Sequence, residues 1–255
     1  MKRLFAVLIC FTIFCSLTGC SLGEQNKEVV DENFYCKVID GNNIAIGNVK
    51  TYPKSGAVFF PEQIENYTVS KIGFSSGLGF GGNGYLQSSG ESGTVIERCY
   101  FPRTIKEVSS DYMKLAGNLK IFYCGEVIDV ACLNTEHRVS EIYVPAEKYD
   151  LFKNVLSEQY FGGSLLKANV SYHLNYDENS YYYIDYYENG EKICYIPPIP
   201  QRDGYAFGGW FKEADCINQW FFDADTVQIT EEEQEVKLYA KWIGCSNRVK
   251  QRCVL

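Results

Sequence analysis

Side chains of the types that catalyse reactions do not stand close together in this chain. The 255 residues include two histidines, His137 and His173, which lie far apart in the sequence. A nucleophilic pair of His137 with Cys124 or Cys132 is formally possible, because such catalysis needs a thiol beside an imidazole. No local signature surrounds either cysteine, so we interpret His137 as a surface side chain. We predict no catalytic residue and expect that the protein is not an enzyme.

A glycine-rich stretch has the spacing of a dinucleotide-binding loop. Gly77, Gly79 and Gly82 stand in a G-x-G-x-x-G pattern. That loop works only where a helix starts directly after the glycines and binds the pyrophosphate at its N-terminus. Residues 83–90 are rich in glycine and serine and do not favour a helix. We interpret the stretch as an insertion and predict no cofactor.

Metal ligation is not indicated by the pattern of acidic residues or cysteines. Residues 177–180 read Asp-Glu-Asn-Ser and lack the alternate spacing of oxygen ligands in a calcium-binding loop. We interpret them as a hairpin turn. The chain also has no C-x-x-C pair outside its first 20 residues, so a zinc ribbon is not supported. We predict no metal site.

The remaining cysteines have two possible states. In an exported chain they could form disulfides, or they could stay as buried thiols that pack like small apolar side chains, and both alternatives stay open. The residues concerned are Cys36, Cys99, Cys124, Cys132, Cys194, Cys216, Cys245 and Cys253.

The N-terminus has the parts of a bacterial export signal. A basic start precedes the apolar run Leu4–Leu17, which is shorter than the roughly 20 residues that span a bilayer as a helix. The run ends in Leu17-Thr18-Gly19-Cys20, which resembles the lipobox of bacterial lipoproteins. The resemblance implies a signal peptide of residues 1–19 and a diacylglyceryl group on the Cys20 sulfur. Two acyl chains suffice for stable anchoring in a membrane.

Composition narrows the partners and the fold class. The formal net charge is −8, which argues against nucleic acid as a partner and against anionic lipid surfaces beyond the lipid anchor. The chain contains 20 tyrosines and 16 phenylalanines, and glycine is far more frequent than proline. Aromatic residues favour strands and glycine favours turns, so we expect a mostly β fold.

Residues 34–160 carry a weak repeat. Strand-like runs end at the dipeptides 60–61, 101–102 and 144–145. Each interval between them is close to the length of two repeats of about 21 residues. A further run, Leu119–Tyr123, lies between the last two. The pattern resembles the bacterial surface-protein type of leucine-rich repeat, which implies a short solenoid. Residues 149–156 have apolar side chains at helical spacing, so we expect a capping helix there.

Residues 169–243 carry a more specific pattern. Its parts are G-Y-x-F-x-G-W, then W-x-F, then L-Y-A-K-W. They are similar to the Listeria–Bacteroides repeat, the B repeat of internalin-type surface proteins, and the resemblance implies a small β-grasp-like fold. The residues of the motif core are Gly204, Tyr205, Phe207, Gly209, Trp210, Trp220, Phe222 and Trp242.

One strand of this pattern requires an irregularity. Phe207 and Trp210 are an odd number of residues apart, so a regular strand would point them to opposite faces. A bulge at Gly208 and Gly209 would return both rings to the core, and glycine suits the backbone of a bulge.

A run of tyrosines between residues 172 and 187 provides the candidate contact surface. Consecutive tyrosines in strands leave some rings exposed, and exposed aromatic side chains are common at binding interfaces. We single out Tyr182 and Tyr186 as the candidate contact residues.

These observations predict a signal peptide (1–19), a tether (20–33), a leucine-rich-repeat solenoid (34–160), a Listeria–Bacteroides repeat module (169–243) and a tail (244–255). We expect a lipoprotein on the extracellular face of the bacterial membrane that binds a protein or glycan of a cell surface. The alternative is a structural spacer or wall-associated protein without a specific ligand.

Overall fold

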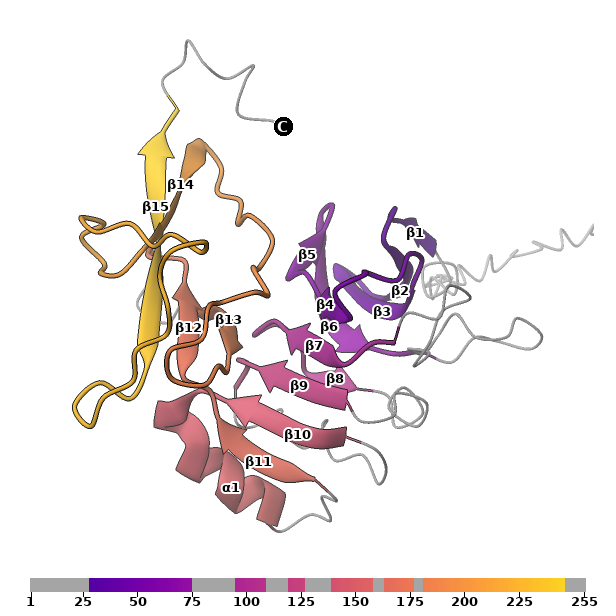
Figure 1. Ribbon diagram of the computed structural model, residues 1–255. Helices are drawn as coiled ribbons and strands as arrows, with labels where there is room; N and C mark the ends of the chain where they lie inside the picture. The colour runs from indigo at the N-terminus through magenta and orange to yellow at the C-terminus, as the bar shows by residue number, and fades with distance from the viewer. Residues whose placement is uncertain are drawn as a thin grey trace, which may run out of the picture.

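The computed structural model describes residues 28–74, 95–108, 119–126, 139–157, 163–176 and 181–245. The fold is mostly β, and the described strands form three sheets (Figure 1). Several predicted features lie outside the described residues: the signal peptide and Cys20, the glycine motif 77–82, Cys132, His137, the turn 177–180 and Cys253.

The first sheet contains a hairpin and three parallel strands. Its members are β1 (Glu28–Val30), β2 (Phe34–Asp40), β3 (Asn43–Val49), β5 (Gln63–Ile64), β6 (Tyr67–Ile72) and β8 (Glu107–Val108). β2 and β3 pair antiparallel, whereas β3, β6 and β8 run parallel. β1 lies within the stretch 20–33 that we expected to be a tether. It belongs to the fold because Val29 is buried and pairs with Cys36 of β2.

The second sheet is entirely parallel. Its members are β4 (Ala57–Phe59), β7 (Arg98–Phe101), β9 (Leu119–Tyr123), β10 (Val139–Val144) and β11 (Ser164–Lys167). They lie side by side in the order of the sequence. From β3 to β9 the chain alternates between the first and the second sheet. β11 pairs with β10, so the parallel sheet extends beyond residue 160, where we expected the first domain to end.

A common apolar core lies between these two sheets. Val58, Cys99, Ile121 and Ile142 occupy matching positions on neighbouring parallel strands and are buried. The helix α1 (Tyr149–Ser157) follows the short 3₁₀ helix η2 (Ala146–Lys148). α1 covers the end of this core beside β11 (Figure 1), and its Phe152 and Leu156 are buried, as the helical spacing predicted.

The other face of the parallel sheet carries a ladder of aromatic rings. Phe59, Tyr100, Phe122 and Tyr143 lie in register on β4, β7, β9 and β10. Successive ring centroids are 4.0, 4.7 and 4.8 Å apart, and the rings are nearly parallel. We call these four residues the aromatic ladder.

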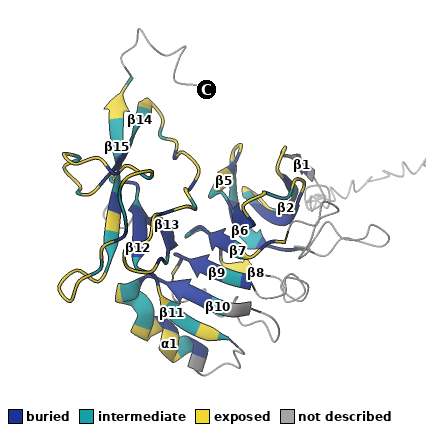
Figure 2. Ribbon diagram, in the orientation of Figure 1, coloured by how far each residue is buried: buried dark blue, intermediate teal, exposed yellow. Residues whose placement is uncertain are grey.

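The third sheet has four strands in the order β13-β12-β15-β14. They are β12 (Val170–His173), β13 (Tyr181–Asp185), β14 (Tyr205–Phe211) and β15 (Val236–Gly244). The two central strands, β12 and β15, run parallel, and each outer strand is antiparallel to its neighbour. Burial is concentrated in the strands of this unit, whereas its long loops are largely exposed (Figure 2).

The predicted bulge in β14 is confirmed. The pairing of β14 with β15 shifts between Phe207 and Trp210. Gly209 adopts φ +107°, a conformation that glycine tolerates and other residues rarely adopt. The rings of Phe207 and Trp210 meet edge to face, with centroids 5.3 Å apart, in the same core.

Replacing Gly209 with alanine should lower the free energy of unfolding by about 1 to 2 kcal/mol, because a side chain at this φ is strained. The new methyl group would also lie 2.9 Å from Nε2 of Gln219. Gly244→Ala in β15 is the matched control, because it has no neighbour within 4 Å. Urea unfolding of both variants measures the effect, and equal stability of the two would contradict the bulge argument.

Candidate functional site

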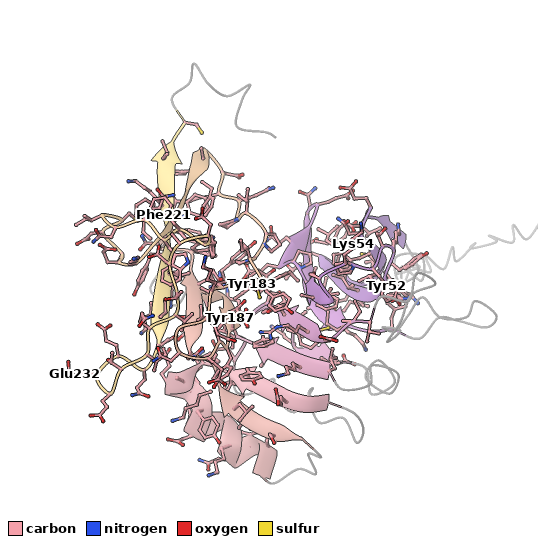
Figure 3. All side chains as sticks on the ribbon, viewed as in Figure 1. Tyr52, Lys54, Tyr183, Tyr187, Phe221 and Glu232 are labelled. Atoms are coloured by element: carbon pink, nitrogen blue, oxygen red, sulfur yellow. The ribbon has the colours of Figure 1, made fainter. Side chains whose placement is uncertain are left out.

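The third sheet packs through β13 against the outer face of the parallel sheet. The ring of Tyr183 lies edge-on to Phe59 at 5.2 Å, and its hydroxyl donates a hydrogen bond to the carbonyl of Phe60 at 2.8 Å. We call the first two sheets with α1 the first unit and the third sheet with its loops the second unit. In Figure 3, Tyr183 and Tyr187 lie between the two units. Four tyrosines of the run are therefore buried rather than available for contact: Tyr172, Tyr181, Tyr183 and Tyr187.

A buried ion pair joins the two units. The guanidinium of Arg98 on β7 is paired with the carboxylate of Asp185 at the end of β13. Asp185 is fully buried, and the Arg98 side chain is 14% exposed. The hydroxyl of Tyr100 donates to Oδ2 of Asp185 at 2.9 Å, and the backbone N–H of Tyr186 donates to Oδ1 at 2.8 Å. Burial raises the pKa of Asp185 to about 6, although Arg98 acts in the opposite direction.

Aromatic rings complete the surroundings of this arginine. The guanidinium carbon of Arg98 lies 4.4 Å from the ring centroid of Phe122 and 4.4 Å from that of Tyr195. Such cation–π contacts are strongest where water is excluded. Arg98 is thus held by residues of both units, and its side chain lines the cleft described next.

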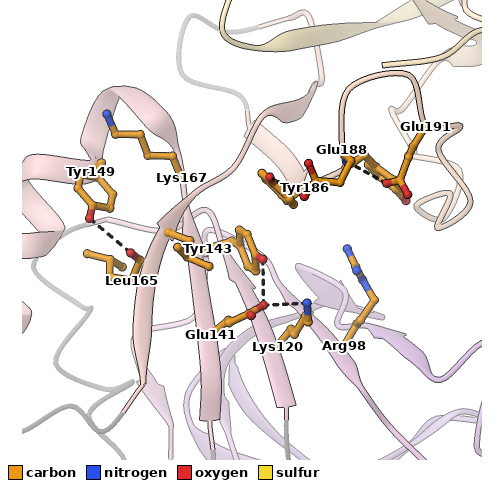
Figure 4. A pocket seen from close by; sticks show the side chains of 12 residues that line it. Arg98, Lys120, Glu141, Tyr143, Tyr149, Leu165, Lys167, Tyr186, Glu188 and Glu191 are labelled. Carbon is orange, nitrogen blue, oxygen red and sulfur yellow. Dashed lines mark hydrogen bonds and ion pairs between the residues drawn. The ribbon is translucent and has the colours of Figure 1, made fainter. Parts of the chain in front are cut away.

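A cleft of about 700 Å³ lies where the parallel sheet meets the loop that follows β13 (Figure 4). One side is formed by β7, β9, β10 and β11, and the other by residues 186–191. The lining residues are Arg98, Lys120, Glu141, Tyr143, Tyr149, Leu165, Leu166, Lys167, Tyr186, Tyr187, Glu188 and Glu191.

A polar array occupies the centre of the cleft. One carboxylate oxygen of Glu141, Oε2, accepts hydrogen bonds from the Tyr143 hydroxyl at 2.9 Å and from the Lys120 ammonium at 2.8 Å. These bonds, that of Lys120 first, lower the pKa of Glu141. The Lys120 side chain is 41% exposed and that of Glu141 is 29% exposed. The array therefore presents an ionised carboxylate and an ammonium group to solvent, and the hydroxyl of the buried Tyr143 donates to that carboxylate.

Tyrosine rings lie on either side of this array. The ring of Tyr186 stacks on Tyr143 with centroids 5.3 Å apart, and its hydroxyl donates to Glu188 at 3.0 Å. On the other side, the Tyr149 hydroxyl donates to the carbonyl of Leu165 at 3.4 Å. The Lys167 ammonium lies 5.0 Å from the Tyr149 ring centroid. The cleft thus combines tyrosine rings with six charged side chains.

The third sheet and its loops resemble a known protein family. Five aromatic motif residues of this part of the chain share one core: Phe207, Trp210, Trp220, Phe222 and Trp242. Residues 169–241 match the Listeria-Bacteroides repeat domain. This match confirms the predicted Listeria–Bacteroides repeat over residues 169–241. No curated protein matches the chain.

Five aromatic motif residues of the Listeria-Bacteroides repeat domain belong to or pack against one core. Trp210 and Trp220 are buried, and Phe207, Phe222 and Trp242 pack partly buried against the same core. Tyr205 is 39% exposed, and its ring centroid lies 4.0 Å from the guanidinium carbon of Arg202. Gly204 adopts φ +78° in the turn before β14.

The structure separates the two tyrosines that we singled out. Tyr186 lines the cleft between the Listeria-Bacteroides repeat domain and the parallel sheet. Tyr182 does not line it; its ring packs against Tyr183 at 4.4 Å and Trp210 at 6.2 Å. Tyr182 lies within β13, whereas Tyr186 follows the last residue of that strand and belongs to the loop that forms one side of the cleft.

The described cysteines include both predicted states. Cys245 is disulfide-bonded, whereas the free cysteines among the described residues are Cys36, Cys99, Cys124, Cys194 and Cys216. Burial raises the pKa of Cys36 and of Cys124 to about 12. A nucleophilic cysteine requires a lowered pKa, so the surroundings of Cys124 disfavour the thiolate.

Among the residues that line the cleft, only Tyr186 was predicted from the sequence as a contact residue. Arg98, Lys120 and Glu141 form one row across β7, β9 and β10. Their spacing follows the repeat of about 21 residues, which would have placed them on one face. Nothing in the sequence pointed to Asp185 as the partner of Arg98.

Among the described residues, no helix is long and apolar enough to cross a membrane. The same residues contain no cluster of three or more histidine, cysteine or acidic side chains that could hold a metal ion.

Proposed function

We propose that this protein is a lipoprotein on the extracellular face of the bacterial membrane that binds a protein or glycan of a cell surface without catalysing a reaction. The observation that carries the proposal is the cleft between the two units. Its volume lies in the range of ligand-binding clefts, and it combines tyrosine rings with charged groups placed on paired strands. The Listeria-Bacteroides repeat domain at residues 169–241 is consistent with a surface location.

We further propose a fold type for each of the two units. The first unit is a degenerate leucine-rich-repeat solenoid, which the in-register parallel strands and the alternation between two sheets support. The second unit is a β-grasp-like module, which the central parallel pair β12 and β15 with antiparallel outer strands supports.

The proposed anchor depends on Cys20. Replacing Cys20 with alanine should move the protein from the membrane fraction to the soluble fraction or the culture medium, because the lipid attachment atom is lost. Labelling of cells with a palmitate analogue, followed by fractionation, measures both lipid addition and location. Cys36→Ala, which removes a buried thiol, is the control and should keep the label. Labelling that persists in Cys20→Ala would contradict the proposal.

The binding function is tested with the full chain in a detergent that contains no sugar. A glycan array and a pull-down of surface proteins from cells provide the two classes of target. Retention of one target, reduced by Tyr186→Ala, would support the proposal. Lack of retention in both experiments would contradict it.

One observation favours the alternative, a structural spacer. The aromatic ladder is covered by tyrosines of the protein's own second unit. A rigid two-unit body of this kind would suit a spacer, and a protein that binds no target in either experiment would be assigned that role.

A further inference from the structure

We infer that the cleft between the parallel sheet and the loop 186–191 binds an uncharged oligosaccharide segment. The inference rests on the proposed binding function and specifies the class of ligand. Three features of the cleft carry it: nearly balanced charge, a mixed donor and acceptor array, and tyrosine rings on both sides of that array.

The charge of the lining is close to balanced. Three cationic side chains, Arg98, Lys120 and Lys167, face three acidic ones, Glu141, Glu188 and Glu191. Arg98 is paired with the buried Asp185 and Lys120 with Glu141, so the site has an excess of one negative charge. A polyanion such as a sulfated glycan requires a large excess of positive charge, and a basic peptide requires the opposite. The cleft offers neither, so it suits an uncharged ligand.

The polar array suits hydroxyl groups. A hydroxyl can donate one hydrogen bond and accept others. Among the described residues, Oε1 of Glu141 has no hydrogen-bond partner, so it can accept from a ligand hydroxyl. The adjacent Lys120 ammonium has three donors, of which Glu141 uses one. Neighbouring hydroxyls of a sugar ring can therefore donate to Glu141 and accept from Lys120 at the same time.

The tyrosine rings suit the apolar faces of sugar rings. Sugars present patches of C–H groups between their hydroxyls, and these patches pack on aromatic surface. Tyr186 and Tyr149 are partly exposed and lie on either side of the polar array (Figure 4). A segment of more than one sugar could contact both rings.

The site is also fixed before a ligand arrives. Tyr143 is held between the rings of Phe122 and Tyr186, and Lys120 and Glu141 stand on paired strands. Binding to a rigid site loses less conformational entropy, which matters for weak, hydroxyl-rich ligands.

The experiment measures binding of the full chain, in a zwitterionic detergent without sugar groups, to three sets of immobilised probes. The first set holds uncharged glycans: α-glucan, β-glucan, mannan, galactan and N-acetylglucosamine oligomers. The second holds sulfated and uronic-acid glycans, and the third holds acidic and basic peptides. Binding is measured at about 0.1 M and about 1 M salt, where the screening length falls from about 10 to about 3 Å.

We expect retention of at least one uncharged glycan, with affinity that changes little with salt. Tyr186→Ala and Glu141→Ala should each weaken this binding about tenfold, which corresponds to about 1.4 kcal/mol. Tyr205→Ala and Glu107→Ala are the matched controls. Tyr205 is an exposed tyrosine outside the cleft, and Glu107 belongs to the surface pair with Lys71. Both controls should bind as the unmodified protein does.

Other outcomes overturn the inference in distinguishable ways. Salt-sensitive binding to charged glycans or to peptides that depends on Tyr186 would overturn the ligand class and leave the binding function in place. Binding to an uncharged glycan that is equal in all four variants would overturn the assignment to this cleft. Lack of binding to every probe set and to surface proteins would overturn the proposed function itself.

Discussion

Replacing Arg98 with methionine should lower the free energy of unfolding by about 3 to 5 kcal/mol at pH 7, because it leaves a buried carboxylate without its partner. Asp185 is fully buried, and Arg98 provides its counter-charge. The methionine would keep part of the packing on Phe122 and Tyr195 but not the charge. Urea unfolding followed by circular dichroism measures the change.

Two further variants test the cause of this loss. Lys71→Met removes one member of an exposed ion pair with Glu107. It should lower the free energy of unfolding by less than about 1 kcal/mol. The double variant Arg98→Met/Asp185→Leu removes both charges and should recover much of the lost stability, because paired buried charges can be replaced by apolar side chains at low cost. A loss below about 1 kcal/mol in Arg98→Met alone would contradict the role of this ion pair.

Lowering the pH from 7 to 4 should destabilise the protein by about 3 kcal/mol through His173 alone. Burial, with a smaller contribution from Lys237, lowers the pKa of His173 to about 4, against about 6.5 in an unfolded chain. Between these values the unfolded chain binds the proton and the folded protein does not. The stability is therefore fully present above pH 6.5 and is lost as the pH falls toward 4.

The variant His173→Phe isolates this effect. The imidazole lies 4.9 Å from the Tyr181 ring and 5.1 Å from the Tyr239 ring, between centroids, and a phenyl ring keeps these contacts. Burial raises the pKa of Asp185 and of Glu235, so these carboxyl groups favour folding at lower pH and oppose His173. The difference between the two proteins at each pH removes those contributions. Parallel stability profiles from pH 7 to pH 4 would refute the prediction.

The sequence predicted local features of the fold where one residue type has few alternatives. The bulge at Gly208 and Gly209 followed from two aromatic residues at odd spacing, because only an extra residue returns both rings to one core. The helix at 149–157 followed from apolar side chains at a spacing that places them on one face of a helix. The mostly β character followed from the aromatic content.

The contacts between the two units could not be predicted from local pattern. Tyrosine is common both in exposed and in buried strands, so the run at 172–187 did not reveal that β13 would be covered on both sides. The pairing of Arg98 with Asp185 joins positions 87 residues apart, and no periodicity relates the two units. The cleft arises from that packing, and for this reason only Tyr186 among its residues was proposed from the sequence.

The start of β1 at Glu28 limits how far the folded part can stand from the bilayer. Between Cys20 and this strand the chain has about seven residues, which can reach about 25 Å when fully extended. With the proposed lipid on Cys20, the edge of the first sheet that carries β1 would stay within that distance of the lipid headgroups. The folded part would therefore be held close to its own membrane rather than carried out on a long stalk.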